Sequence, residues 1–156
     1  MANYYKLNIS FSVRKDLQLN EFSALSHLVN GAGDMPENLP DHEFFYKENV
    51  KNIVSIPYVY RDFTFGEYSS SFWIAEMSQG ITILLPGIKD SEGWYQKLKF
   101  VDWLCTFCIK DCFLGYISQE YDEYSVSLLY SVKRKLYFKD SKDLKYLNSF
   151  STGEPL

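Results

Sequence analysis

The sequence has few of the residues that mark fibrous, disulfide-stapled or secreted proteins. Five prolines and eight glycines among 156 residues exclude collagen-like and low-complexity chains. The three cysteines are an odd number clustered within residues 105–112, which does not make a disulfide framework. The N-terminal residues show no basic segment followed by an apolar run, so we expect no secretory signal. These features favour a soluble, cytoplasmic protein.

Long hydrophobic runs are also missing. The longest uncharged stretches, residues 22–33 and 77–88, are too short to span a bilayer, so we expect no membrane partner. Apolar residues nevertheless make up 46% of the chain and charged residues 23%, a balance typical of a compact fold. We expect a single domain over residues 1–156, with a frayed tail over 149–156.

Basic residues are outnumbered by acidic ones. Sixteen Lys and Arg stand against twenty Asp and Glu, for a net charge of −4, which argues against general nucleic-acid binding. Lys133, Arg134 and Lys135 form the only basic cluster and lie between two apolar runs. A charged hairpin tip is the favoured interpretation of this cluster, and a phosphate contact is the alternative.

Patterns that name a reaction are absent. The chain has two histidines, His27 and His42, and no G-x-S-x-G, H-E-x-x-H or P-loop motif. Residues 31–33 are Gly-Ala-Gly, but Asp34-Met35-Pro36 follows, which does not fit a dinucleotide-binding loop. We therefore expect no catalytic residue, no enzyme activity and no cofactor.

Cys105, Cys108 and Cys112 include a C-x-x-C motif, which can indicate metal binding or redox chemistry. A structural zinc site needs a fourth ligand, and neither histidine lies near in sequence. All three cysteines continue a helical stripe that begins at Trp94 and Leu98, where a free thiol behaves as a small apolar side chain. Core packing is therefore favoured over metal binding or redox chemistry.

The first half of the chain shows clear periodicity. Residues 5–13 alternate apolar and polar side chains strictly, which predicts a half-buried strand. Apolar residues then recur at helical spacing and predict a helix over 16–29, with Asn30-Gly31 as its stop. Residues 30–42 collect Gly, Pro, Asp and Asn and predict a loop.

Further elements follow with short connections. Three β-like runs, 58–65, 71–77 and 80–85, predict an antiparallel meander that ends at Pro86-Gly87. Ser91 is a candidate N-cap for a helix whose apolar stripe continues to Cys112. Strands are predicted at 114–119, 124–132 and 136–139, followed by a helical turn anchored by Leu144 and Leu147.

The predicted order is β-α-β-β-β-α-β-β-β. Short connections make the sheet antiparallel, and the two helices need one apolar face to cover. The expected fold is an α+β two-layer sandwich, with an antiparallel sheet and two helices on one face.

One acidic, aromatic segment is the main candidate for a binding site: Glu120, Tyr121, Asp122, Glu123 and Tyr124. Three interpretations are open. The segment is a solvated hairpin tip, a hot spot for a basic partner, or a calcium or glycosidase site, although the spaced loop with glycine that calcium prefers is missing. The loop with Asp34, Glu37, Asp41 and Glu43 is a second acidic element. Aromatic residues, 18% of the chain and mostly Tyr and Phe, favour a surface that binds.

The C-terminal half resembles immunity proteins of bacterial polymorphic toxin systems. The resemblance lies in the Trp-bearing helix from Trp94, in Gly115-Tyr116-Ile117, in the acidic turn, and in the hairpin of Leu128-Leu129-Tyr130 and Lys135-Leu136-Tyr137-Phe138. It implies a non-catalytic inhibitor that binds and occludes a cognate toxin, a basic effector domain, through an acidic, tyrosine-rich surface. We assign the contacts to residues 120–124, with Asp41 and Glu43 in a lesser role.

Other classes of function fit the same residues. A phage-encoded inhibitor of a host defence protein would also be small, acidic and without a catalytic motif. A small-ligand-binding domain or enzyme would require a deep apolar pocket with convergent polar groups. A structural subunit would require a large apolar patch and an obligate oligomer. A monomer or a dimer is compatible with the sequence.

Overall fold

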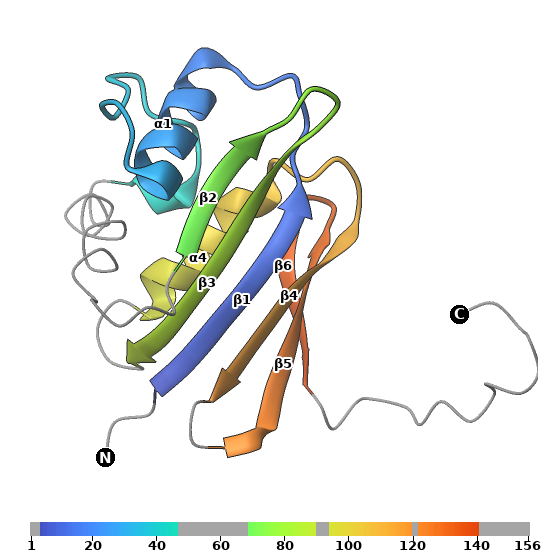
Figure 1. Cartoon of the computed structure of the whole chain (residues 1–156). Coiled ribbons are helices and arrows are strands. Elements are labelled where there is room, and N and C mark those ends of the chain that lie inside the picture. The colour runs from blue at the N-terminus through green and yellow to red at the C-terminus, as the bar shows by residue number, and fades with distance from the viewer. Residues whose placement is uncertain (1–3, 47–68, 90–93, 120–121, 141–156) are drawn as a thin grey trace, which may run out of the picture.

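The computed structural model describes residues 4–46, 69–89, 94–119 and 122–140 (Figure 1). In chain order the elements are β1 (Tyr4–Ser12), α1 (Leu19–Asn30), the 3-10 helix η1 (Glu43–Phe45), β2 (Ser69–Ile74), β3 (Gln79–Lys89), α4 (Trp94–Cys105), β4 (Cys112–Gln119), β5 (Asp122–Val132) and β6 (Lys135–Asp140). The strands form one antiparallel sheet in the order β2-β3-β1-β4-β5-β6, and both helices cover one of its faces. The predicted α+β sandwich is confirmed.

Strand β1 lies between β3 and β4 in the sheet. Its alternating side chains suit a sheet with one covered face. Leu7, Ile9 and Phe11 are buried, whereas Ser10 and Ser12 are exposed on the opposite face. The strand pairs antiparallel with β3 on one side and with β4 on the other. The strand predicted over 5–13 is therefore confirmed and holds the two halves of the sheet together.

Helix α1 follows the predicted pattern closely. Glu21, in its first turn, accepts a hydrogen bond from the Gln18 amide, and the helix ends at Gly31, whose φ of 62° is in the left-handed region. Leu25 and Leu28 are among the residues that it buries. The predicted helix and its glycine stop are confirmed, although the helix begins at Leu19 rather than at residue 16.

Strand β3 is longer than the sequence predicts. Pro86-Gly87 does not end it, because the strand continues to Lys89. β2 pairs with residues 79–84, so among the residues that the structure describes β1 is the only strand beside β3 beyond Leu84. The β1–β3 register shifts between Tyr5 and Leu7. A proline fits there because a strand edge and an irregular register need no amide from it.

Helix α4 is shorter than predicted. It ends at Cys105, and the amides of Thr106 and Phe107 donate to Trp103 and Leu104 in a tighter terminal turn. Cys108 instead forms an isolated bridge with Val13, and Cys112 begins β4. The prediction of one helical stripe from Trp94 to Cys112 is thus wrong beyond Cys105, whereas the strand predicted over 114–119 is confirmed as part of β4.

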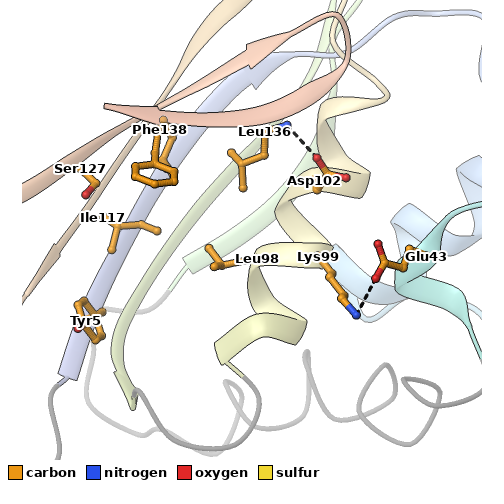
Figure 2. Close-up of a pocket in the computed structure, with 10 residues that line it drawn as sticks. Tyr5, Glu43, Leu98, Lys99, Asp102, Ile117, Ser127, Leu136 and Phe138 are labelled. Carbon is orange, nitrogen blue, oxygen red and sulfur yellow. Dashed lines mark hydrogen bonds and ion pairs between the residues drawn. The ribbon is translucent and has the colours of Figure 1, made fainter. Parts of the chain in front are cut away.

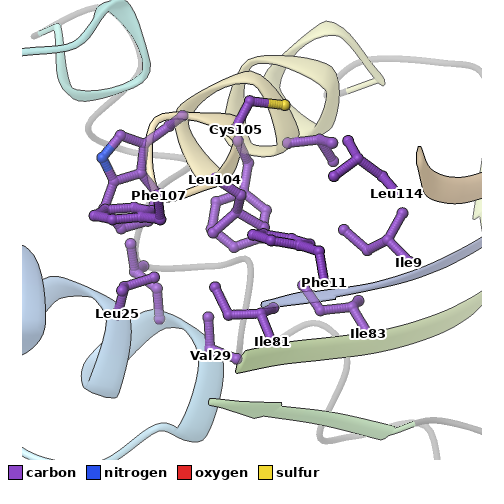
Figure 3. Packing of buried hydrophobic residues seen from close by; sticks show 14 of the residues in the cluster. Ile9, Phe11, Leu25, Val29, Ile81, Ile83, Leu104, Cys105, Phe107 and Leu114 are labelled. Carbon is purple, nitrogen blue, oxygen red and sulfur yellow. The ribbon is translucent and has the colours of Figure 1, made fainter. Parts of the chain in front are cut away.

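The core lies between the sheet and the two helices. Figure 3 shows Leu25 and Val29 of α1, Leu104 and Cys105 of α4, and strand side chains of β1 and β3 meeting in this layer. Trp103 is fully buried, and its ring stacks on Phe44 and meets Phe107 edge to face. η1 is thereby fixed against α4 by aromatic packing.

The β5–β6 hairpin turns at Lys133 and Arg134, which confirms a charged tip. Both residues have positive φ, 50° and 61°, as a two-residue turn between twisted strands requires. The Lys133 amide donates to Asp111 Oδ1 at 2.7 Å, which ties the tip to the segment before β4.

Several expected elements lie outside the described residues. These are the strand at 58–65, the Ser91 cap, the helical turn with Leu144 and Leu147, and the tail at 149–156.

Candidate functional site

The acidic, aromatic segment lies at the end of the β4–β5 hairpin. Gln119 and Asp122 pair across the two strands, and Gln119 also pairs with Tyr5 of β1. Glu120 and Tyr121 lie outside the described residues, and Asp122, Glu123 and Tyr124 are placed as the backbone of the first residues of β5. The turn is therefore located at one end of the sheet, beside the first residues of β1.

The second acidic element leads into η1. Asp41 is exposed just before this 3-10 helix, and Glu43 is its first residue. Glu43 Oε1 lies 2.9 Å from Lys99 Nζ of α4, and both side chains are accessible to water. An exposed pair of this kind contributes at most about 1 kcal/mol to stability, so Glu43 remains a candidate for contacts with a partner.

A pocket of about 490 Å³ opens between α4 and the strands β1, β4, β5 and β6 (Figure 2). Its apolar wall is made by Leu98, Ile117, Leu129, Leu136 and Phe138. Its polar residues are Tyr5, Glu43, Lys99, Asp102 and Ser127. Sequence reasoning did not find this pocket, because its lining comes from η1, α4 and four strands whose positions depend on the tertiary fold.

Glu43 and Tyr5 lie on opposite sides of the pocket (Figure 2). Glu43 lines it directly, and Tyr5, on its other side, pairs with Gln119 at the end of β4. The β4–β5 turn therefore begins next to the pocket. Asp41 precedes η1 and is not among the lining residues.

Asp102 accepts two hydrogen bonds in the wall of the pocket. Its Oδ2 accepts a hydrogen bond from His42 Nε2 at 3.0 Å, and its Oδ1 accepts one from the Leu136 amide at 2.8 Å. His42 Nδ1 accepts from the Phe44 amide at 3.0 Å, so the ring proton is on Nε2 and is donated to Asp102. Both ring nitrogens are engaged in structure, which leaves neither nitrogen to act as a base.

The cysteines belong to the core. Cys105 and Cys108 are buried, and Cys112 is half-buried with its Sγ 3.8 Å from Cys108 Sγ. Burial away from water raises the pKa of both buried thiols to about 12, so they remain protonated at neutral pH. Within the described ranges no three His, Cys, Asp or Glu side chains gather as a metal site.

Arg14 is a structural cation rather than a binding one. Its guanidinium contacts both carboxylate oxygens of Glu21, at 2.9 and 3.0 Å, and lies 5.5 Å from the centre of the Phe107 ring. A further hydrogen bond from Arg14 is the main cause that lowers the pKa of Asp16. The end of β1 is thereby joined to α1 and to the segment after α4.

The face of the sheet turned away from the helices carries aromatic side chains. Figure 1 shows this open face toward the viewer, with α4 behind the strands. Phe113 lies opposite Tyr130, and Tyr130 lies opposite Tyr137 on β6. The rings of Phe113 and Tyr130 meet at 5.5 Å between centroids. Part of the aromatic content is thus found on the open face, away from the acidic turn.

The chain matches no protein-family model, no curated protein and no solved structure. Neither helix of the described segments has the length and apolar content needed to cross a membrane.

Proposed function

We propose that the protein is a cytoplasmic, non-catalytic inhibitor of the immunity-protein class, which binds a basic toxin domain. One observation carries the proposal: Glu43 of one acidic element lines an apolar pocket, and the β4–β5 hairpin that holds the other acidic element leaves the sheet beside Tyr5, which lines the same pocket. Carboxylates around an apolar depression suit a cationic protein surface, because charge steers the encounter and the apolar wall supplies contact area.

The mechanism we propose is occlusion. The rim of the pocket and residues 120–124 cover the active site or substrate groove of the toxin, and no bond is made or broken. The engaged nitrogens of His42 and the protonated thiols of Cys105 and Cys108 support a role without chemistry. A phage-encoded inhibitor of a defence protein would work by the same contacts, and the identity of the recovered partner distinguishes the two.

The test begins with affinity capture of the partner from the native host. We expect one stoichiometric, basic protein whose activity is suppressed at a one-to-one ratio. In the double variant Asp122→Lys/Glu123→Lys, association should slow by roughly tenfold or more at low salt and by less at high salt.

A matched control carries the same change of charge elsewhere. Asp16 and Glu76 are exposed and lie outside both acidic elements, so Asp16→Lys/Glu76→Lys should slow association much less. Equal effects of the two double variants would mean that only net charge matters. No change in the first variant at low ionic strength would refute the contact surface.

Binding of a small molecule is the second candidate, and the pocket favours it. Its volume of about 490 Å³ and its apolar wall with a few polar groups fit a metabolite-sized ligand. Native mass spectrometry of the protein purified from its host would detect a bound mass. A spectrum that shows the mass of the protein alone, together with capture of a toxin, would reject the binding of a small molecule.

A further inference from the structure

The charges on the pocket wall do not cancel. Lys99 Nζ is 2.9 Å from Glu43 Oε1, so these two groups neutralise one another. Asp102 accepts hydrogen bonds from His42 and from the Leu136 amide, but within the described ranges it has no lysine or arginine partner. His42 is in its neutral form when Nδ1 accepts from Phe44. The wall therefore has the unbalanced negative charge of Asp102.

The carboxylate of Asp102 is held in place and is still accessible. Its two oxygens each accept one N–H, from His42 and from Leu136, which fixes the orientation of the group. Each oxygen keeps a further lone pair, and the side chain is 38% exposed. An acceptor that is already oriented binds a donor with a smaller loss of conformational freedom.

The apolar wall beside Asp102 suits an aliphatic chain. Leu98 and Leu136 line the pocket, and Phe138 is 71% exposed at its side (Figure 2). Long basic side chains combine an aliphatic stem with a charged end, so the stem can pack on apolar side chains while the end reaches a carboxylate. Arginine also matches a carboxylate with two parallel N–H donors, whereas lysine offers a single point charge.

We propose that this pocket is an anchor site for an arginine side chain of the partner, with the stem between Leu98, Leu136 and Phe138 and the guanidinium on Asp102. The inference rests on the proposed function for the partner. The pocket itself is tested with a small guanidinium compound, so its properties are measured independently of any toxin.

The experiment is a titration of the full chain, labelled with ¹⁵N and ¹³C, with n-butylguanidinium chloride, followed by NMR. Pentanoate, of similar length and opposite charge, and the uncharged butan-1-ol are titrated in parallel. We expect saturable shifts at Leu98, Asp102, Leu136 and Phe138 with the guanidinium compound. Pentanoate and butanol should bind at least about tenfold more weakly, because they lack the charge-assisted hydrogen bonds.

Two variants separate the contributions of charge and apolar contact. Asp102→Asn should weaken butylguanidinium binding by roughly tenfold. Phe138 is exposed, so Phe138→Ala should keep the fold and, through the lost apolar contact with the butyl stem, weaken binding by about threefold. Phe113→Ala, an exposed phenylalanine on the open face, is the matched control and should leave the affinity unchanged. Thermal unfolding of each variant shows whether it is folded. If Asp102→Asn does not fold, the comparison of Phe138→Ala with Phe113→Ala tests the site in its place.

Equal affinity for butylguanidinium and butanol, stronger binding of pentanoate, or shifts that lie away from the pocket would each overturn the arginine site. Failure here is distinct from failure of the proposed function. If the guanidinium compound does not bind but Asp122→Lys/Glu123→Lys still slows association with the captured toxin, the inhibitor function stands and the anchor site is wrong. If the compound binds and no toxin is captured, the site stands without that function.

Discussion

His42 Nε2 donates a hydrogen bond to Asp102 Oδ2 across 3.0 Å, and this bond joins the entrance of η1 to the middle of α4. The second oxygen of Asp102 accepts the amide of Leu136 on β6. Three segments that are distant in the sequence therefore meet at one carboxylate. The pocket wall depends on this junction, and the junction can be tested by substitution.

Replacement of His42 by alanine should destabilise the fold. His42→Ala removes the donor to Asp102 and the acceptor of the Phe44 amide, which we expect to cost roughly 1–3 kcal/mol in the free energy of unfolding. Urea denaturation measures this loss. His27→Ala is the matched control: its Nδ1 lies 2.8 Å from the Gly33 carbonyl oxygen at an exposed site, and the loss of this bond should cost less than about 1 kcal/mol. Equal losses would contradict the structural role of His42.

Gly115 should tolerate no side chain. It lies opposite Ile9 with a φ of 153°, and a Cβ atom there would overlap the carbonyl oxygen of Asn8. Gly115→Ala should therefore force β4 away from β1 and cost at least about 3 kcal/mol, or prevent folding. Gly33→Ala meets no neighbouring atom and carries only the strain of its positive φ, about 1 kcal/mol. Circular dichroism and thermal melts of the two variants give the comparison.

Stability should fall at alkaline pH because of the buried thiols. Cys105 ionises near pH 9.0 in an unfolded chain, but burial raises its pKa to about 12 in the folded one. Between these values the unfolded state loses the proton first, so rising pH favours unfolding. Between pH 8 and 10.5 we expect Cys105 to contribute a loss of about 1–2 kcal/mol.

The matched variant for this effect is Cys105→Ala. Its absolute stability will be lower because of a cavity, but the slope of its unfolding free energy against pH above 9 should be smaller than in the parent chain. Identical slopes would show that the thiol does not carry the effect.

The β5–β6 turn offers a stabilising substitution. Lys133 and Arg134 both have positive φ, which residues with a Cβ adopt at a cost, whereas Asn-Gly adopts such a turn readily. Lys133→Asn/Arg134→Gly should raise the free energy of unfolding by about 1 kcal/mol, since the amide of residue 133 can still donate to Asp111. Chemical denaturation measures the free energy of unfolding of the variant and of the parent chain. A loss of stability would show that the charged side chains contribute more than the relief of strain.

The elements with a simple periodicity were predictable. Strict alternation located β1, and helical spacing with Asn30-Gly31 located α1 and its end. The spacing of Cys105, Cys108 and Cys112 was misleading, because all three side chains contact the core although only Cys105 is helical. Cys108 and Cys112 contact the core from outside the helix, so the helical spacing of the cysteines continues beyond the end of α4.

The orientation of β5 and the position of the pocket required the tertiary structure. Ser131 is buried and Ser127 lines the pocket, whereas Tyr130 lies on the open face, so these two serines share the covered face with Leu129. Alternation alone does not say which set is covered. The pairing of His42 with Asp102 spans 60 residues and leaves no local sequence signal.

The central position of β1 has a consequence for synthesis on the ribosome. Its side-chain partners Thr82 and Tyr116 lie 72 and 108 residues beyond Ser10 and Asn8, respectively. β1 is therefore synthesised well before both of its neighbours, and until they emerge its two edges are free to pair with other chains. We expect nascent chains that stop before β4 to aggregate more readily than the full chain, because one edge of β1 then has no partner strand.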